Sequence, residues 1–571
     1  MTFSQPVNAW RHMRPRASTL GPDGERSGRW RVLLAMGGFG LLYGLLGVRL
    51  VLLGVSAQGE DKDVARLVLA QSQPRPDVID RNGEILATDV KTASLFAEPR
   101  RIIDADDASE LLSALFPDLD RDRLRQQLSS DAGFVYIKRQ ITPAQQQAVH
   151  KLGLPGIGFR VENRRFYPGG PTASHVLGAV NIDNQGIAGV EKYIDRSFLN
   201  DLSMAGFDTG HALSPVRMAI DLRVQNVVRD EITAGLEHYK AIGAVGIVMD
   251  VQTGEVIAMT SAPDYDPNNP SGALDRNTIN RGMVGVYEMG STFKTFTIAM
   301  ALDSGAAKMT DSFDASHSLQ VGRFTIHDMH SQGRALTVPE IFKYSSNVGT
   351  GRMVMKLGVD LQREYLKRFG FLDTLHTELP ETGAPIVPKA WPLITSITVA
   401  FGHGISVSAL QTAAAGVAMV NGGIYYPPTF LPRSQEEAAQ LGRPVINAST
   451  SENIRKLFRL NVIQGSGRSA NVPGYVVGGK TGTAEKVENG HYSHTKVRNA
   501  FLAAFPMDSP RYLVLTLIDD PQNVDGRDNQ SAHNAAPMAG NIIRRIAPML
   551  DVTPRPADQE DAAVLALASA R

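Results

Sequence analysis

Two apolar hairpin patterns that enclose a long helical region constrain the fold more than any other feature of this chain. Residues 243–263 and 499–519 each read as two apolar strands joined by a polar turn. The stretches between them with helical periodicity are 292–305, 337–358 and 406–423. Strands first, helices in the middle and strands last predict one antiparallel sheet with a segregated helical subdomain, an α+β fold.

The N-terminal region carries a second strong pattern. Residues 1–31 hold six arginines and few acids, and a mostly apolar run follows over residues 32–55, interrupted by Arg49. As a helix this run reaches roughly 35 Å, enough to cross a bilayer core. The arginine excess predicts a cytoplasmic tail over residues 1–31 and a single transmembrane anchor over 32–55, with the remainder outside. The alternative is a signal peptide cleaved near Val55-Ser56-Ala57.

The remainder divides into two predicted domains and a tail. Residues 56–214 contain no nucleophile with a base, so we interpret them as an elongated pedestal for docking or dimerisation. Within it, Asn82-Gly83 between apolar runs predicts a hairpin, and residues 105–155 read as helical. Residues 215–550 form the α+β domain, and the Pro-, Ala- and charge-rich segment 551–571 is predicted to be disordered.

Composition excludes several functions. The 571 residues include no cysteine, which removes disulfides, thiolate metal sites and a cysteine nucleophile. Lys+Arg and Asp+Glu number 58 each, so charge gives no case for nucleic acid as a partner. His327 and His330 resemble a metal pair but lack a third ligand, and we expect neither a metal nor another cofactor.

Three short motifs in the α+β domain carry candidate chemistry. They are Ser291-Thr292-Phe293-Lys294, Ser345-Ser346-Asn347 and Lys480-Thr481-Gly482-Thr483. On a helix, positions i and i+3 share a face, so the Lys294 amine can reach the Ser291 hydroxyl. A serine becomes a nucleophile when a neighbouring base takes its proton, and lysine can be that base when its pKa is lowered.

The other two motifs predict groups around this pair. Lys480 supplies positive charge that faces Lys294 or a substrate carboxylate, while Thr481 and Thr483 supply hydroxyls. Gly482 lets a substrate backbone lie along this strand as an added strand. In the middle motif, Ser345 is predicted to relay a proton between Lys294 and a leaving amine, and Asn347 to donate to a substrate amide.

The three motifs in this order resemble the active-site set of penicillin-recognising serine enzymes, with Ser346 where that set often has Asp. RPDVIDRNGEILATD and RFYPGGPTASHVLGAVNIDNQGIAGVEKYID resemble pedestal signatures of class B penicillin-binding proteins, although Pro76 follows Arg75 where the signature usually has Gly. TSAPDYDPNN and FGHGISVSALQ resemble segments around the transpeptidase site. Within that class the chain is most similar to the septal FtsI-type branch.

The resemblance implies a peptidoglycan D,D-transpeptidase that β-lactams inhibit. Ser291 would attack the penultimate D-Ala carbonyl of a stem pentapeptide, with Lys294 as general base. The backbone N–H groups of Ser291 and Thr483 would form the oxyanion hole. The implied partners are stem peptides of the lipid-linked precursor, an FtsW-type glycosyltransferase and other divisome proteins at the bacterial inner membrane, with the catalytic domain in the periplasm.

Three alternatives stay open at this point. The chain could serve cell elongation rather than division. It could be a catalytically silent divisome scaffold, although its motifs are intact. It could be a β-lactamase or β-lactam sensor, although its long N-terminal module and single predicted anchor suit neither.

Overall fold

The structure is a computed structural model that describes residues 34, 36–49, 75–205, 214–488, 490–524, 526–556, 561, 562 and 564–566. The chain separates into two compact units, residues 1–73 and 74–571. In the first, residue 34 and residues 36–49 are helical, whereas the predicted cytoplasmic tail and the rest of the predicted anchor lie outside the described residues. Among described residues, no helix combines the length and the apolar character that crossing a bilayer requires.

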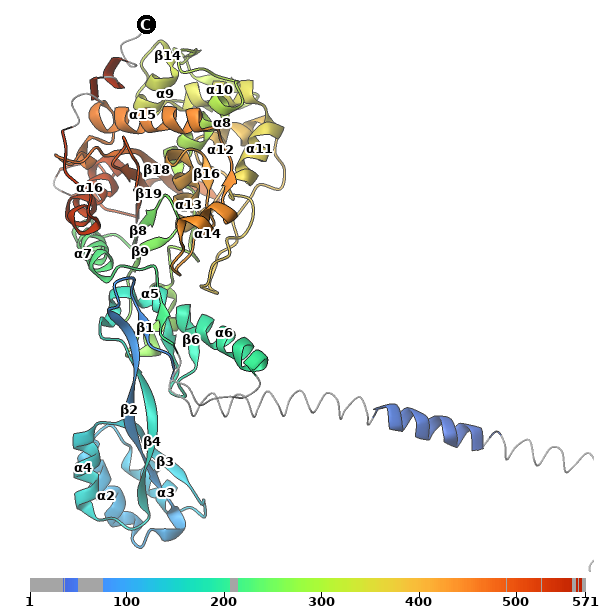
Figure 1. Cartoon of the computed structure of the whole chain (residues 1–571), viewed down its shortest axis with the longest axis vertical. Coiled ribbons are helices and arrows are strands. Elements are labelled where there is room, and N and C mark those ends of the chain that lie inside the picture. Colours follow the sequence, from blue (N-terminus) through green and yellow to red (C-terminus); the bar gives the residue numbers. More distant parts are fainter. Residues whose placement is uncertain are drawn as a thin grey trace, which may run out of the picture. The chain divides into compact units, whose positions relative to one another are not determined.

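The pedestal part of the second unit is built on a long antiparallel ribbon. Strands β2 and β4 pair along ten residues each, and Figure 1 shows them side by side over their length. The strands are β1 (Val78–Ile79), β2 (Ile85–Ala97), β3 (Val135–Ile141), β4 (Ile157–Phe166), β5 (Ala179–Val180), β6 (Gly186–Ala188) and β7 (Val216–Arg217). The helices are α2 (Ala105–Leu115), α3 (Arg121–Leu128), α4 (Pro143–Leu152), α5 (Ser174–Leu177) and α6 (Gly189–Ala205).

The pedestal shows where the pattern succeeded and where it failed. The predicted hairpin at Asn82-Gly83 joins β1 to β2. The prediction of helix throughout 105–155 is wrong at β3, which pairs with β2 and takes its place in the sheet. Its β-branched Val135, Ile137 and Ile141 suit a strand, and partners distant in sequence stabilise it.

A buried ionic network ties the ribbon to α6. Arg165, fully buried, donates to Glu191 at 2.7 Å and to Asp89 at 3.2 Å, while Arg75 donates to Glu191 at 2.9 Å. Arg165 also donates to the carbonyl of Pro76 at 2.9 Å. Proline lacks an N–H but keeps this carbonyl, so Pro76 is compatible with the network.

The predicted antiparallel sheet is confirmed in the α+β domain, which is the second of the two predicted domains. Its strand order is β18-β19-β20-β8-β9, and every neighbouring pair is antiparallel. The elements are β8 (Gly243–Asp250), β9 (Val256–Ala262), β18 (Gly478–Glu488), β19 (His491–Phe505) and β20 (Tyr512–Asp519), with α7 (Leu222–His238) and α16 (Ala535–Ile546). The β18 strand lies at the edge of the sheet, where a further strand can be added.

Helices cover both faces of this sheet, which explains why its strands are apolar almost throughout. On β20, Leu513, Leu515 and Leu517 join one core, while Val514 and Ile518 join another that includes α7 and α16. The first core continues into the helical subdomain (Figure 1). Its helices are α8 (Lys294–Asp303), α9 (Val338–Tyr344), α10 (Asn347–Leu357), α11 (Val359–Arg368), α12 (Leu393–Ala400), α13 (Ala409–Val420), α14 (Gln435–Leu441) and α15 (Ala448–Gln464).

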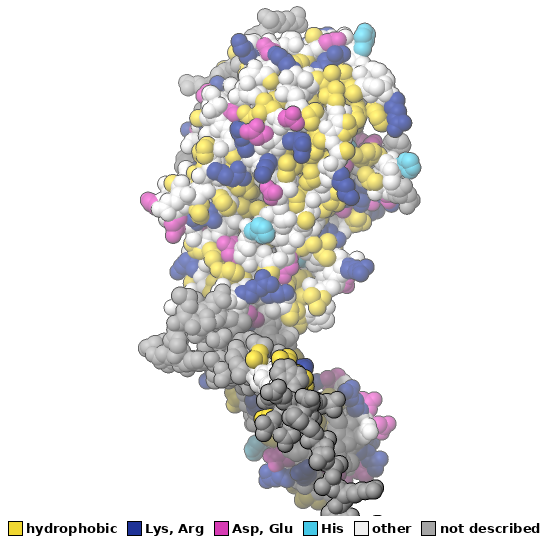
Figure 2. All heavy atoms as spheres, turned by 90° about the vertical axis from the view of Figure 1, so that its right-hand side faces the viewer, with side chains coloured by type: hydrophobic (Ala, Val, Ile, Leu, Met, Phe, Trp, Pro, Cys, Tyr) yellow, Lys and Arg dark blue, Asp and Glu magenta, His cyan; other side chains and the backbone are white. Residues whose placement is uncertain are grey.

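Short two-stranded ladders connect the helices of this subdomain. They pair β10 (Val286–Tyr287) with β15 (Val407–Ser408), β11 (Ser312–Asp314) with β14 (Ala335–Thr337), β12 (Leu319–Val321) with β13 (Phe324–Ile326), and β16 (Ile424–Tyr425) with β17 (Arg443–Pro444). Figure 2 shows the face on the right-hand side of Figure 1, where acidic and basic side chains are interspersed around a band of hydrophobic ones. No field of a single sign dominates this face.

Part of the segment predicted to be a disordered tail packs against the second domain. Asp561 forms an ion pair with Arg459 of α15 at 2.6 Å, and Val564 is 6% exposed. The tail therefore contains packed residues as well as the composition typical of disorder.

Candidate active site

Ser291 lies at the start of the buried helix α8, in a tight turn formed by Gly290–Phe293. Gly290 has φ +49°, and a Cβ there would meet the carbonyl oxygen of Thr483 at 2.5 Å. Only glycine accepts both this backbone conformation and this close approach. The backbone of this turn therefore lies directly against strand β18.

Lys294 occupies the centre of the site and is fully buried. Its Nζ lies 2.9 Å from Ser291 Oγ, 2.7 Å from Asn347 Oδ1 and 3.1 Å from Ser345 Oγ. A fourth contact, of 2.5 Å, joins it to the Ser345 carbonyl oxygen. The predicted Ser-x-x-Lys geometry is therefore present, and one amine contacts residues of two motifs.

The environment favours the neutral form of this amine. Burial lowers the pKa of Lys294 well below its ordinary value, and the positive charge of Lys480 lowers it further, whereas Asp328 opposes the shift. A neutral amine has a lone pair that can accept a proton from a hydroxyl 2.9 Å away. The site therefore holds a serine beside a base capable of activating it.

The middle motif lies at a break between two helices that the sequence suggested were one. Helix α9 starts with a capping box, in which the Thr337 and Glu340 side chains each bond the other's backbone N–H. It ends at Ser345, which adopts a left-handed conformation with φ +58°, and α10 starts at Asn347. The break turns the Ser345 hydroxyl and the Asn347 amide toward Lys294.

Asp328 supports this break and was missed by the sequence analysis. Its carboxylate accepts from Ser346 Oγ at 2.6 Å and from the Val348 N–H at 2.9 Å. Ser346 itself has no carboxylate, and the middle motif receives one from the loop after β13. The same loop orients Asn347, whose side-chain N–H₂ donates to the His327 carbonyl at 3.2 Å. Asn347 is therefore held at both ends of its amide, and one N–H of its side chain is used by neither contact.

Lys480 approaches Ser345 from strand β18. Its Nζ donates to Ser345 Oγ and to the Thr481 carbonyl, both at 3.1 Å, and lies over the Phe342 ring. Burial lowers the pKa of Lys480 to about 7. Ser345 Oγ is thus placed between two lysine amines, each 3.1 Å away.

The rest of the third motif lines the other wall. A Cβ on Gly482 would meet the Met289 carbonyl at 2.5 Å, so glycine is required for β18 to lie this close to the Ser291 turn. Thr483 Oγ1 accepts from the Ser531 N–H at 3.2 Å, and Thr481 Oγ1 lies 2.5 Å from Ser466 Oγ. The structure brings all predicted site residues of the three motifs into one cluster. Ser466, like Asp328, carried no motif by which the sequence analysis could find it.

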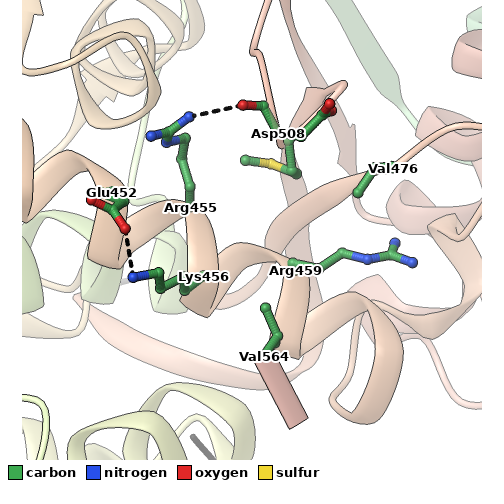
Figure 3. Close-up of a pocket in the computed structure, with 8 residues that line it drawn as sticks. Glu452, Arg455, Lys456, Arg459, Val476, Asp508 and Val564 are labelled. Atoms are coloured by element: carbon green, nitrogen blue, oxygen red, sulfur yellow. Dashed lines mark hydrogen bonds and ion pairs between the residues drawn. The ribbon is translucent and has the colours of Figure 1, made fainter. Parts of the chain in front are cut away.

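A separate cavity of about 210 Å³ lies beside α15 and the packed tail (Figure 3). Lys456 pairs with Glu452 at 2.6 Å, and Arg455 donates to the Asp508 carbonyl at 3.4 Å. Val564, from the tail, lines one side. Most of its charged side chains have ion-pair partners, and none of its lining residues is a serine, threonine or cysteine, so this cavity offers no nucleophile with a base.

Comparison with known families matches both parts of the second unit. Residues 244–544 match the family described as penicillin binding protein transpeptidase domain, and residues 70–198 match the penicillin-binding protein dimerisation domain. The first match contains every residue of the three motifs.

Individual proteins extend the similarity to most of the chain. A probable peptidoglycan D,D-transpeptidase FtsI of Caulobacter vibrioides is 38% identical over 548 residues, covering 92% of this chain and 90% of that protein. A probable peptidoglycan D,D-transpeptidase PenA of Neisseria meningitidis is 32% identical, covering 80% and 82%. The crystal structure of penicillin binding protein 3 from Mycobacterium tuberculosis, complexed with aztreonam, shares the fold with a TM-score of 0.65 at 24% identity, covering 85% of this chain and 98% of that one.

Proposed function

The chain belongs to the class B penicillin-binding proteins of the FtsI type and is a serine D-Ala-D-Ala transpeptidase of peptidoglycan. From this premise we propose that Ser291 is its nucleophile and Lys294 its general base. The observation that carries the proposal is the 2.9 Å contact between Ser291 Oγ and a fully buried lysine amine whose pKa is lowered.

In the acylation step, the Ser291 hydroxyl gives its proton to Lys294 as Oγ attacks the penultimate D-Ala carbonyl carbon of a donor stem peptide. The backbone N–H groups of Ser291 and Thr483 stabilise the negative charge on the carbonyl oxygen. Loss of one such donor typically lowers a rate by about 10²–10³-fold.

Breakdown of the tetrahedral intermediate requires a proton on the leaving amine. Ser345 Oγ lies 3.1 Å from Lys294 Nζ and can pass the proton that Lys294 accepted to that amine. The peptide C–N bond then breaks, the terminal D-Ala leaves, and the donor stays bound to Ser291 as an ester. Lys480 donates to Ser345 and supplies positive charge beside the relay.

The second step repeats this transfer in reverse. An amine of a neighbouring stem peptide attacks the ester carbonyl, and its proton returns through the same groups to Ser291 Oγ. A new amide joins the two stem peptides, and the serine is regenerated. Thr481, Gly482 and Thr483 on the edge strand β18 position the donor by adding it to the sheet, with the Thr481 hydroxyl directed at the terminal carboxylate.

Covalent labelling with a fluorescent penicillin tests this assignment. The full-length chain should take up one label that persists, because the leaving amine of the opened β-lactam ring stays attached to the acyl group and does not diffuse away. Ser291→Ala should abolish labelling at an unchanged thermal unfolding midpoint. Ser304→Ala, at the end of the same helix α8, is the matched control and should label normally.

The other outcomes discriminate between the alternatives. Rapid release of the label would favour a β-lactamase. Failure of the folded protein to label would favour a catalytically silent scaffold, and equal labelling of Ser291→Ala would remove Ser291 from the mechanism.

We also propose that residues 32–55 anchor the protein in the inner membrane with the second unit in the periplasm. The apolar run and the six preceding arginines support this placement. An FtsW-type glycosyltransferase and other divisome proteins are the proposed partners. Depletion of the protein should yield filamentous cells. In undepleted cells, fractionation should find the protein in the membrane fraction. Round cells would point to elongation instead, and a soluble protein would contradict the anchor.

A further inference from the structure

Ser466 contacts the active-site strand but has no role in the mechanism above. Its Oγ lies 2.5 Å from Thr481 Oγ1, and either oxygen can be the donor in this contact. Thr481 is 7% exposed, and the proposed mechanism assigns its hydroxyl to the donor's terminal carboxylate. The proton arrangement between these two hydroxyls therefore decides what Thr481 can offer to a substrate.

The position of Ser466 is fixed by a buried amide. Asn461, fully buried near the end of α15, accepts from the Ser466 N–H at 3.1 Å and faces Ser466 Oγ at 3.3 Å with the same oxygen. Its side-chain N–H₂ donates to the carbonyl of Gly479 on β18 at 2.8 Å. Asn461 thus holds the Ser466 loop and strand β18 against each other. The contact between Ser466 and Thr481 is therefore fixed by a buried hydrogen-bond network.

Each hydroxyl carries one proton, so two arrangements are possible. In the first, Ser466 donates to the Asn461 oxygen and accepts from Thr481, which consumes the Thr481 proton. In the second, Ser466 donates to Thr481, and the Thr481 proton is free to point into the cleft. The contact of Ser466 with Thr481 is shorter than its contact with Asn461, by 2.5 Å against 3.3 Å.

Thr483, two residues along β18, offers a comparison. Its Oγ1 accepts from the Ser531 backbone N–H, which can only donate, so the Thr483 proton is always free of that partner. Thr481 has a hydroxyl instead of an N–H as its partner, and its proton can take either direction. A partner that donates is needed before Thr481 can give its proton to an anion while its own oxygen stays satisfied.

We propose that Ser466 is a positioning residue for recognition of the donor's terminal carboxylate. When the carboxylate enters, Ser466 donates to Thr481 Oγ1 and Thr481 donates to the carboxylate, so that two hydroxyl protons turn in sequence. No covalent bond changes in this step. The inference rests on the proposed function, because it assigns Thr481 the carboxylate contact.

A pair of acyl donors separates this role from a structural one. The full-length chain and its variants are assayed with an acyl-D-alanyl thioester of mercaptoacetate, which ends in a carboxylate, and with the methyl ester of the same compound. Ser466→Ala should lower kcat/KM for the carboxylate by about tenfold, mainly through KM, since Thr481 Oγ1 then has no donor from Ser466 while its own proton engages the anion. The methyl ester should lose less than about twofold, because it presents no anion.

Ser466→Thr is the conservative control and should restore the discrimination, since it keeps the hydroxyl. Equal losses on both thioesters, or no loss on either, would overturn the proposal, as would failure of Ser466→Thr to restore the carboxylate preference when its thermal unfolding midpoint is unchanged. No turnover of either thioester by the unaltered chain would instead overturn the proposed function, and the inference would fall with it.

Discussion

Lys480 gives the site a pH dependence with a definite sign. Because burial lowers its pKa to about 7, its charge is present below about pH 7 and lost above. We expect the second-order rate constant for acylation by a carboxylate-bearing penicillin to fall about tenfold between about pH 7 and about pH 9. Stopped-flow acylation of the folded chain across this range measures the profile.

Lys480→Arg is the control, because a guanidinium keeps its charge throughout this range. If that variant stays folded and acylates, its profile should lack the fall at high pH. An identical fall in both proteins would mean that a group other than Lys480 titrates.

Asp328 is expected to influence the pKa of Lys294 through its negative charge. Asp328→Asn keeps the shape but removes the charge that raises the pKa of Lys294. The pKa of Lys294 should then fall further, and the rising limb of the acylation profile should move to lower pH. Because one of two donors loses its acceptor, we also expect a loss of about 1–2 kcal/mol in stability, measured by thermal unfolding.

Asp314→Asn serves as the matched control, since this exposed carboxylate contacts Ser316 and Arg352 outside the motifs. It should change neither the profile nor acylation. A rising limb that stays in place in Asp328→Asn would contradict the electrostatic role of Asp328.

At the scale of single residues, the sequence predicted the site residues that belong to a short motif and missed those that do not. Ser291 and Lys294 are three positions apart on one helical turn, so their contact follows from local geometry. Asp328 reaches Ser346 across 18 residues, and Ser466 reaches Thr481 across 15. Such contacts depend on how loops fold over one another, which no local pattern encodes.

The break between α9 and α10 makes a prediction at the level of elements. Ser345 adopts φ +58°, which costs a residue with a Cβ about 1–2 kcal/mol relative to glycine. Ser345→Gly should therefore be more stable than Ser345→Ala by about 1 kcal/mol in thermal unfolding. Both variants should lose acylation by roughly 10²-fold or more, because both lack the hydroxyl that is proposed to relay the proton.

The paired variants control for each other, since they differ only in backbone freedom. Retention of acylation by either variant would remove the Ser345 hydroxyl from the proton relay. A glycine variant less stable than the alanine variant would contradict the strain argument.

Element boundaries were predictable where a local signal marks them. The two hairpins of the large sheet followed from apolar strands and turn residues, and the structure confirms both. The helical periodicity of 337–358 concealed the break, because neither Ser345 nor Ser346 is a proline or glycine, the residues that usually mark the end of a helix. Strand β3 was missed because its pairing with β2 lies outside the local sequence.

At the scale of the whole molecule, the packed tail connects the C-terminus to the active-site strand. The Arg459 side chain is 5% exposed and pairs with the Asp561 side chain, which is 26% exposed. Arg459 also donates to the carbonyl of Val477 at 2.7 Å, directly before β18. Composition alone predicted disorder here, because an ion pair across 102 residues leaves no trace in composition.

Removing either partner of this ion pair is expected to lower the free energy of unfolding, and removing Arg459 should lower it more than removing Asp561. Asp561→Ala leaves a buried guanidinium that still donates to Val477 and to Asn471 Oδ1, so we expect a loss of about 1–3 kcal/mol. Arg459→Met also leaves the Val477 carbonyl without its donor and should cost about 3 kcal/mol or more.

Thermal unfolding of the full-length chain measures both losses. Glu452→Ala is the control, because Glu452 pairs with Lys456 on an exposed face of the same helix, and its stability should stay within about 1 kcal/mol of the parent. Penicillin labelling should slow in Arg459→Met more than in Asp561→Ala, since Val477 fixes the start of β18. Equal midpoints for Asp561→Ala and the parent would mean that the tail does not dock in solution.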